Sequence, residues 1–319
     1  MEFTTDYFSD IIESAVSGID YPAEPRGLYE PIRYTLEGGG KRLRPVLLLA
    51  SAAAYGLKPE KAVSQALGIE MFHNFTLLHD DVMDNADVRR GRPAVHRRWN
   101  EATAILSGDA MVTMATQMIS RSPARLLPGV LYLFNRTAME IYQGQQYDMD
   151  FENRRDVSEG EYMEMIRLKT SVLLACACHM GALLACASDT DQKAMYRYGE
   201  LLGLAFQLRD DYLDTYGDPA IFGKAIGGDI VNEKKTWLWI MASQRDAEGL
   251  KEILDRRLSD HLKVEAVKEL YDRLGLPEES AALIDRYVAD AVASLPQSLP
   301  HEAAEFFRSL ALKLSSRES

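Results

Sequence analysis

Residues 62–84 have the sequence AVSQALGIEMFHNFTLLHDDVMD, and this stretch decides the fold class. Its apolar residues recur at intervals of three and four, as on one face of a helix, and the run is too long for a strand. It ends in three aspartates, Asp80, Asp81 and Asp84. The stretch therefore predicts a long, largely apolar helix with a cluster of carboxylates at its carboxyl end.

The same helical spacing recurs in residues 105–120, 168–187 and 196–214. Between such stretches glycine, proline, aspartate and serine cluster, as they do at helix ends, and convincing alternating strands with hairpin turns are absent. No linker, low-complexity tract or short-period repeat divides the chain. We expect one large all-α helical bundle, folded as a single domain over residues 1–319.

Composition and charge exclude several classes of protein. The chain has 319 residues, of which 47% are hydrophobic and 26% charged, as in ordinary folded proteins. The formal net charge of −12 opposes binding to nucleic acid, so we expect no nucleic-acid partner. Every apolar run meets a charged residue before about eighteen residues, so no membrane span is predicted.

The cysteines and the N-terminus indicate a cytoplasmic protein. Cys176, Cys178 and Cys186 fall in one apolar stretch, without the pattern of a disulfide framework. Packed, reduced thiols are favoured over metal binding, because no second Cys/His pair lies at a ligand spacing. Residues 1–16 carry early acidic residues and no basic segment before their apolar run, so they do not resemble a signal peptide.

A second Asp-rich segment repeats the first. RDDYLD at residues 209–214 has the same DDxxD pattern as HDDVMD at residues 79–84, and each follows a strongly apolar helical stretch. Within a helix the three carboxylates of each motif lie close together, at the end where the helix dipole is already negative. Such a cluster requires a cation, and aspartate oxygens suit magnesium, which completes its shell with water and phosphate oxygens.

Five basic segments supply possible phosphate ligands: GGGKRLRP (38–45), DVRRGRP (87–93), RLKTS (167–171), FGKAIGG (222–228) and NEKKT (232–236). Arginine binds phosphate oxygens through two parallel donors, lysine supplies a mobile charge, and glycine lets the backbone approach a phosphate closely. Any one segment could be a surface patch. Together with two acidic clusters they predict a diphosphate-binding enzyme.

At this point the chain resembles the polyprenyl synthetase family, the trans-isoprenyl diphosphate synthases, over essentially its whole length. HDDVMDNADVRRG (79–91) is similar to the family's first Asp-rich motif and FQLRDDYLD (206–214) to its second. The resemblance implies an isoprenoid synthase fold around a deep central cavity, with the two motifs facing each other across its mouth. It also implies a homodimer and a magnesium-dependent prenyltransferase of isoprenoid biosynthesis, with about three magnesium ions per active site.

The resemblance assigns roles residue by residue. Direct magnesium ligands would be Asp80, Asp84 and Asp210, supported by Asp81, Asp211 and Asp214. Isopentenyl diphosphate would be held by Lys41, Arg44, His73 and Arg90. The allylic diphosphate would be held by Arg89, Lys169, Lys224 and Lys234, with Thr170 and Gln207 lining the reacting carbons. Glu233 stands where the family usually has Asn, so Lys234 and Lys235 both remain candidates for that phosphate contact.

The histidines are distinguished by their positions. His73 lies seven residues before Asp80, two helical turns away on the same face, so it can reach the same pocket. His79 and His96 match no ligand position of the family and are expected to be structural. Gln145 and Asp148 resemble a further motif that lines the cavity.

The reaction implied is head-to-tail condensation of isopentenyl diphosphate with an allylic diphosphate, which releases diphosphate. In the family a bulky side chain four or five residues before the first Asp-rich motif closes the pocket for the carbon tail. Here Phe75 and Thr76 occupy these positions. The single aromatic residue favours a short product, geranylgeranyl or farnesyl diphosphate, over a longer polyprenyl diphosphate.

Two other functions compete with this interpretation. A class I terpene synthase also ionises a prenyl diphosphate, but its second metal motif normally mixes Asn, Ser or Thr with Glu, and it needs no site for a second diphosphate. A regulatory or scaffold subunit of a heteromeric synthase would be expected to lose its Asp-rich motifs. Both motifs are intact here.

Overall fold

The computed structural model describes residues 3–218 and 226–315. Its tertiary contacts divide the chain into two compact units. The first unit comprises residues 3–136, 176–196 and 296–306, and the second comprises the described parts of 137–175, 197–295 and 307–319. The expectation of a single domain stays a prediction.

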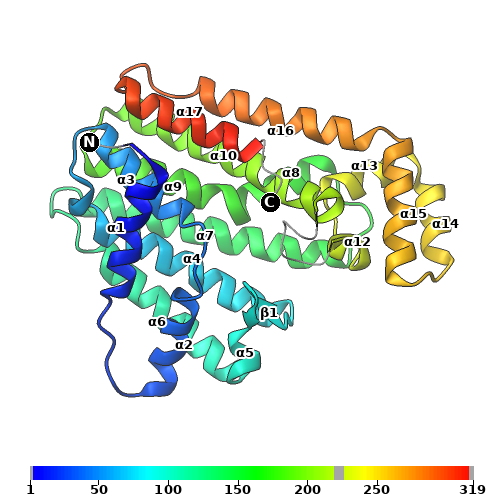
Figure 1. Cartoon of the computed structure of the whole chain (residues 1–319), viewed down its shortest axis with the longest axis horizontal. Coiled ribbons are helices and arrows are strands. Elements are labelled where there is room, and N and C mark those ends of the chain that lie inside the picture. The colour runs from blue at the N-terminus through cyan, green and yellow to red at the C-terminus, as the bar shows by residue number, and fades with distance from the viewer. Residues whose placement is uncertain (1–2, 219–225, 316–319) are drawn as a thin grey trace. The chain divides into compact units, whose positions relative to one another are not determined.

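The first unit consists of helices and one short hairpin (Figure 1). Its elements are α1 (Thr5–Ser17), α2 (Arg26–Leu36), α3 (Leu43–Ala54), the 3₁₀ turn η1 (Pro59–Lys61), α4 (Val63–Met83), β1 (Val88–Arg89), β2 (Arg92–Pro93), α5 (Val95–Arg98) and α6 (Glu101–Ile119). The long helix expected from residues 62–84 is α4.

The second unit contains α8 (Glu159–Ile166), the π-helical turn η2 (Arg167–Ser171), α12 (Gly228–Val231), α13 (Trp237–Arg245), α14 (Ala247–Asp255), α15 (Asp260–Arg273) and α16 (Leu276–Ala293). Four helices contain residues assigned to both units: α7 (Leu127–Glu152), α9 (Val172–Leu184), α10 (Asp189–Tyr216) and α17 (His301–Ser315). The all-α prediction is confirmed.

Helix α4 packs closely against α6, because glycines remove side chains at two points of contact. A Cβ atom added to Gly108 would lie 2.2 Å from Nε2 of His79, and one added to Gly68 would lie 2.8 Å from Cγ1 of Ile119. His79 is therefore a packing residue, and its Nε2 also lies 3.0 Å from the carbonyl oxygen of Ile105. This contact anchors the carboxyl end of α4, where the first Asp-rich motif begins.

The hairpin formed by β1 and β2 was not expected from the sequence. Val88 pairs with Pro93 and Arg89 with Arg92 in antiparallel register. Arg90 and Gly91 form the turn, with φ angles of 51° and 71°. Two successive residues with positive φ are typical of the tight turns that match the twist of a hairpin. The turn fixes the backbone from which Arg89 and Arg90 extend.

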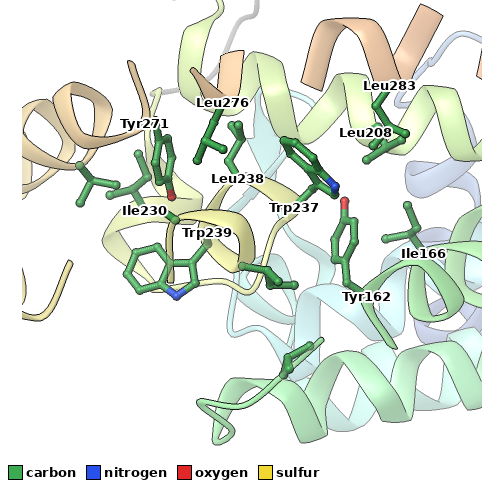
Figure 2. Packing of buried hydrophobic residues seen from close by; sticks show 14 of the residues in the cluster. Tyr162, Ile166, Leu208, Ile230, Trp237, Leu238, Trp239, Tyr271, Leu276 and Leu283 are labelled. Atoms are coloured by element: carbon green, nitrogen blue, oxygen red, sulfur yellow. The ribbon is translucent and has the colours of Figure 1, made fainter. Parts of the chain in front are cut away.

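The core of the second unit is aromatic (Figure 2). Tyr162, Trp237, Trp239 and Tyr271 are buried among aliphatic side chains of the same cluster. Burial of an aromatic side chain removes about 150–250 Å² from water, so these few residues contribute much of the stability of this unit. Tyr162 lies in α8, directly before η2, and links this core to the chemistry described below.

One helical stretch, Glu159–Leu184, has the length and apolar character that a membrane span requires. Of its most apolar window 72% is buried inside the protein, which is also the behaviour of a core helix.

Candidate active site

The first Asp-rich motif lies at the carboxyl end of α4, with Asp80 and Asp81 in its last turn and Asp84 at its C-cap. Arg89 donates from Nε and Nη2 to Oδ1 of Asp81, at 2.8 and 2.5 Å. Its Nη2 also lies 3.8 Å from Oδ2 of Asp80. Arg89 therefore lies against the acidic motif, as a residue that binds both a carboxylate and an incoming phosphate would.

The two ionic partners shift each other's titration. Burial raises the pKa of Asp81, although the charge and hydrogen bonds of Arg89 act against that shift. Burial would lower the pKa of Arg89, but Asp81 and Asp80 outweigh it and raise the pKa. Arg89 thus compensates part of the cost of burying the Asp81 carboxylate.

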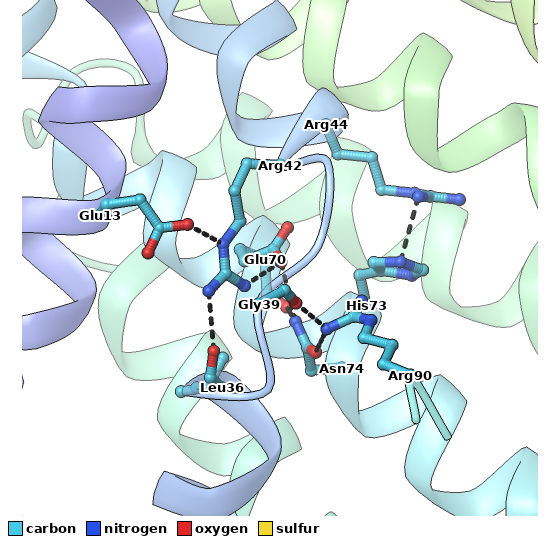
Figure 3. Close-up of polar contacts among 9 residues, drawn as sticks. All are labelled: Glu13, Leu36, Gly39, Arg42, Arg44, Glu70, His73, Asn74 and Arg90. Atoms are coloured by element: carbon cyan, nitrogen blue, oxygen red, sulfur yellow. Dashed lines mark hydrogen bonds and ion pairs between the residues drawn. The ribbon is translucent and has the colours of Figure 1, made fainter. Parts of the chain in front are cut away.

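A separate group of basic side chains, Arg44, His73 and Arg90, here termed the basic pocket, surrounds the position two helical turns earlier on α4 where His73 lies (Figure 3). Nη1 of Arg44 lies 3.1 Å from Nε2 of His73. Because a guanidinium group can only donate, Nε2 must accept, so the imidazole is neutral and carries its proton on Nδ1. Burial and the charges of Arg44 and Arg90 hold the pKa of His73 well below its usual value, which agrees with this assignment.

Arg44 and Arg90 are the cations of this pocket. Burial, helped by the charge of Arg90, lowers the pKa of Arg44 to about 10. Among the described residues, Nε of Arg44 has no hydrogen-bond partner. Arg90 contacts the carbonyl oxygen of Gly39 and Oδ1 of Asn74. Lys41 is exposed at the start of the same segment. The structure thus brings Arg44, His73 and Arg90 together.

Phe75 and Thr76 have different surroundings. Phe75 is 7% exposed, and its ring packs against Phe72 at 5.4 Å and against His79 at 4.7 Å between centroids. The hydroxyl group of Thr76 donates to the carbonyl oxygen of His73 at 2.8 Å, one turn back in the same helix. Of the two product-length candidates, Phe75 therefore has the packed, apolar surroundings suited to a carbon tail.

The second Asp-rich motif lies in the last turns of α10. Asp211 is buried, where it accepts from the hydroxyl group of Tyr162 at 2.5 Å and from Nε2 of Gln207 at 2.8 Å. Burial raises the pKa of Asp211 to about 7, although Lys234 acts against this. Asp214 accepts at Oδ2 from the backbone N–H of Asp229 at 2.9 Å. The half-exposed Asp210 completes the motif.

The π-helical turn η2 carries Lys169 and Thr170. Nζ of Lys169 lies 2.6 Å from Oδ2 of Asp148, and Thr170 donates to Oε1 of Gln207 at 2.9 Å. Burial alone would raise the pKa of Asp148, but the charges of Lys169 and Lys234 outweigh it and lower the pKa. Such π-turns occur often at functional sites, since the extra residue redirects side chains.

Lys234 and Lys235 have different partners. Nζ of Lys234 lies 3.8 Å from Oδ1 of Asp229, and the charges of Asp229, Asp211 and Asp148 raise its pKa. Nζ of Lys235 instead donates to the carbonyl oxygen of Glu233 at 2.6 Å and lies near the ring of Trp239. The geometry therefore favours Lys234 for the phosphate contact. Lys224 lies outside the described residues.

Sequence reasoning missed four buried polar residues around these groups: Arg42, Glu70, Asn74 and Tyr162. Only Tyr162 could have been suspected from the sequence, because it lies two helical turns before Lys169 and would share a helix face with it. Residue type alone does not separate Arg42 from Arg44, since both are arginines of one basic segment, and the family resemblance assigns a role only to Arg44. His96 stays unassigned to the chemistry, and both of its ring nitrogens are buried without a partner among the described residues.

The side chains that could hold a metal are the aspartates of the two motifs. Among the residues that the structure describes, no three His, Cys, Asp or Glu side chains form a ready-made metal cluster. Magnesium typically takes one or two carboxylates and obtains the rest of its shell from water and substrate phosphates. The carboxylates of each Asp-rich motif fit that pattern. The facing of the two motifs across one cavity stays a prediction from the sequence.

Comparison with known proteins identifies what the chain is similar to. Residues 25–274 match the family model described as Polyprenyl synthetase. A geranylgeranyl diphosphate synthase of Methanosarcina mazei is 42% identical over 240 residues, 74% of each chain. A crystal structure of a geranylgeranyl pyrophosphate synthase superposes with a TM-score of 0.94, at 40% identity over 100% of both chains. A polyprenyl synthase of Caulobacter crescentus CB15, complexed with calcium and isoprenyl diphosphate, superposes with a TM-score of 0.87, at 28% identity over 99% and 98% of the chains.

Proposed function

The chain belongs to the polyprenyl synthetase family, and from this premise we propose how its residues carry out the condensation of isopentenyl diphosphate with an allylic diphosphate. The enzyme is a prenyltransferase of isoprenoid biosynthesis that forms short-chain prenyl diphosphates. The identity of each substrate-binding residue and of the product belongs to the proposal.

One observation carries the two-substrate reaction. Helix α4 carries an Asp-rich motif at its end and His73 two turns earlier, where Arg44 of α3 and Arg90 of the hairpin turn complete the basic pocket. Seven residues of helix span about 10 Å, which is enough to keep two diphosphates apart while their carbon chains meet. We assign isopentenyl diphosphate to the basic pocket, together with Lys41. A synthase that only ionised one prenyl diphosphate would not need this pocket.

We propose magnesium as the divalent metal, held by Asp80, Asp84 and Asp210 with support from Asp81, Asp211 and Asp214. The Caulobacter relative is complexed with calcium and isoprenyl diphosphate, which supports the use of a divalent cation. When bound, magnesium neutralises the charge that develops on the departing diphosphate. The number of ions, about three, is proposed from the family resemblance.

The protein's own cations share this task. Arg89, Lys169, Lys224 and Lys234 are proposed to bind the allylic diphosphate and to stabilise its negative charge as the allylic carbon–oxygen bond breaks. The double bond of isopentenyl diphosphate then attacks the allylic cation and forms the new carbon–carbon bond. Loss of one proton, which the released diphosphate accepts, restores a double bond. No protein nucleophile is needed.

Thr170 and Gln207 are suited to the cationic intermediate. The Thr170 hydroxyl group donates its proton to Oε1 of Gln207, and Nε2 of Gln207 donates to the buried carboxylate of Asp211. Because the hydroxyl proton of Thr170 points to Gln207, the lone pairs of its oxygen can interact with a positively charged carbon. We propose that both residues stabilise the allylic cation electrostatically.

We propose geranylgeranyl diphosphate as the main product, with farnesyl diphosphate as the shorter alternative. The ring of Phe75 is buried and packs against Phe72 and His79. We propose that it closes the end of the pocket for the carbon tail, so that the tail stops at roughly fifteen to twenty carbons. A longer polyprenyl product would require small side chains at this level.

The decisive experiment measures products from isopentenyl diphosphate with primers of two, three and four isoprene units. We expect elongation of the first two primers to geranylgeranyl diphosphate and little elongation of the longest. An incubation with farnesyl diphosphate alone is the matching control. A volatile hydrocarbon there, or no product from any primer, would contradict the proposal in favour of a terpene synthase or a subunit without chemistry.

We also propose a cytoplasmic homodimer. The exposed apolar side chains of Leu106 on α6 and Tyr132 on α7, 61% and 70% accessible, support a surface that a second copy covers. The thiol of Cys178 is buried and in its reduced form, which supports a reducing compartment. The molar mass in solution, measured by light scattering, tests the dimer.

A further inference from the structure

Arg42 lies between Lys41 and Arg44 in the basic segment, but its side chain is buried and hydrogen-bonded to other residues of the protein (Figure 3). Nε donates to Oε1 of Glu13, Nη1 to Oε1 of Glu70 and Nη2 to the carbonyl oxygen of Leu36, each at 2.7 Å. The residue is 4% exposed. Arg42 also has a φ of 46°, an unfavourable left-handed conformation for an arginine, which these contacts maintain.

Glu70 connects Arg42 to the next helical turn of α4. Its carboxylate is buried and accepts from Arg42 and from Nδ2 of Asn74, at 2.7 and 2.9 Å. Asn74 is fully buried and donates as well to the carbonyl oxygen of Glu70 at 2.8 Å. Since a carboxylate can only accept, the amide nitrogen of Asn74 must face Glu70.

This orientation turns Oδ1 of Asn74 toward Arg90, whose Nη1 lies 3.4 Å away. Nη1 of Arg90 also donates to the carbonyl oxygen of Gly39. A Cβ atom on Gly40, which has a φ of 137°, would lie 2.9 Å from Cζ of Arg90, so the glycine backbone lies directly against the guanidinium group. The contacts therefore run without a break from Arg42 through Glu70 and Asn74 to Arg90.

Glu70 also balances charge in this region. Burial and the charges of neighbouring arginines lower the pKa values of Arg44 and Arg90, and Glu70 opposes the shift in both. Without it, several guanidinium groups would lie close together in a poorly solvated region. Asn74 is neutral, so its contribution is orientation rather than charge.

We propose that Arg42, Glu70 and Asn74 are positioning residues, which hold Arg90 and the backbone of Gly39 and Gly40 ready for the diphosphate of isopentenyl diphosphate. The inference rests on the proposed function, because it assumes that this pocket binds that substrate. Arg42 itself contacts only protein oxygens, so the three residues act through Arg90. Preorganisation of this kind lowers the entropy that binding would otherwise cost.

The test is a double-mutant cycle with Asn74→Ala and Arg90→Ala. Because Asn74 acts through Arg90, we expect Asn74→Ala to raise the KM for isopentenyl diphosphate about tenfold and to have no further effect in an Arg90→Ala background. The KM for the allylic primer should stay within about twofold, since Arg89, a proposed ligand of that primer, donates to Asp81 rather than to this network.

Gln65→Ala is the matched control. Gln65 is a buried amide on the same helix, but it donates to Ser122 and not toward Arg90. It should lower the melting temperature without a selective change in KM. Asn74→Ser is the second variant, in case the alanine variant does not fold.

The inference would be overturned if the double variant raised the KM for isopentenyl diphosphate by the product of the two single effects. Equal increases in KM for both substrates would overturn it as well. Wild-type enzyme that fails to condense the two substrates would instead contradict the proposed function. The two failures are therefore distinguishable.

Discussion

Lys41, Arg42 and Arg44 lie within one short basic segment, yet their side chains have different surroundings. Lys41 is exposed, Arg42 is bonded to three protein oxygens, and Arg44 contacts His73. All three are cations, so their chemistry alone does not assign their roles. Burial and hydrogen-bond partners distinguish Arg42, which positions the pocket, from Lys41 and Arg44, which can bind a ligand.

Phe75→Ala is expected to lengthen the product. Removing a buried aromatic ring opens space beneath the proposed tail pocket, so products beyond twenty carbons, roughly one or more isoprene units longer, should accumulate. Chromatography of the dephosphorylated products measures the distribution. Phe72→Ala is a useful comparison, because Phe72 packs against both Phe75 and Phe134. An unchanged distribution for Phe75→Ala would remove this residue as the floor.

His73 predicts a dependence of stability on pH. Its pKa in the folded protein lies well below the value of about 6.5 in an unfolded chain, so below that pH the unfolded state binds a proton that the folded state does not. The free energy of unfolding should therefore be highest above about pH 6.5 and fall with decreasing pH, by at most about 1.4 kcal/mol per pH unit for this residue.

Denaturant unfolding of the wild type and His73→Gln between about pH 5.5 and 7.5, roughly one pH unit on either side of 6.5, measures this effect. The difference in free energy of unfolding between the two proteins should become smaller as the pH falls. His179→Gln provides a comparison in the same unit, because burial also lowers the pKa of His179. Parallel curves for wild type and His73→Gln would contradict the assignment.

At the scale of elements, close contact between backbones places catalytic candidates. Gly144 on α7 leaves no room for a side chain, because a Cβ atom there would lie 2.3 Å from the backbone nitrogen of Lys169 in η2. Backbone atoms cannot move aside as a side-chain tip can. The π-helical turn, and with it Lys169 and Thr170, is thus held by its contact with α7.

Gly144→Ala is therefore expected to displace η2 and to lower kcat by at least about tenfold, with a destabilisation of about 1–3 kcal/mol. Gly129→Ala on the same helix is the matched control. A Cβ atom at Gly129 would meet Leu183 at 3.8 Å, an ordinary van der Waals distance. Steady-state kinetics and thermal unfolding compare the two variants. Equal activities would show that η2 does not depend on this contact.

The elements differ in how well the sequence predicts them. Helix α4 follows from its apolar periodicity, and its end follows from the Asp-rich motif. The hairpin of β1 and β2 does not, because each strand has two residues and gives no alternating pattern. The π-turn η2 is also invisible in sequence, since residues 168–187 have the spacing of an ordinary helix.

For the whole molecule, a net charge of −12 contrasts with a function that binds two anionic substrates. Local arginine and lysine clusters and bound cations must reverse the field at the site. Removal of divalent metal with a chelator is therefore expected to lower condensation by at least about a hundredfold, and added magnesium should restore it. Product formation from labelled isopentenyl diphosphate provides the measurement.

The fold itself should survive that treatment. Magnesium obtains much of its shell from substrate phosphates, so the chelator should leave the melting temperature of the substrate-free protein unchanged. Undiminished condensation in the chelator would argue against a metal-dependent mechanism. A large fall in melting temperature would instead indicate a structural metal.

The sequence by itself determined the all-α class, the two carboxylate clusters and the basic segments, because periodicity and spacing along one helix are local properties. It also indicated His73, which shares a face of α4 with Asp80. The tertiary structure decided which polar groups are buried and paired. It placed Glu70 and Asn74 between Arg42 and Arg90, and Tyr162 against Asp211. Such pairings join residues far apart in the chain, and only packing of separate elements brings their atoms within hydrogen-bonding distance.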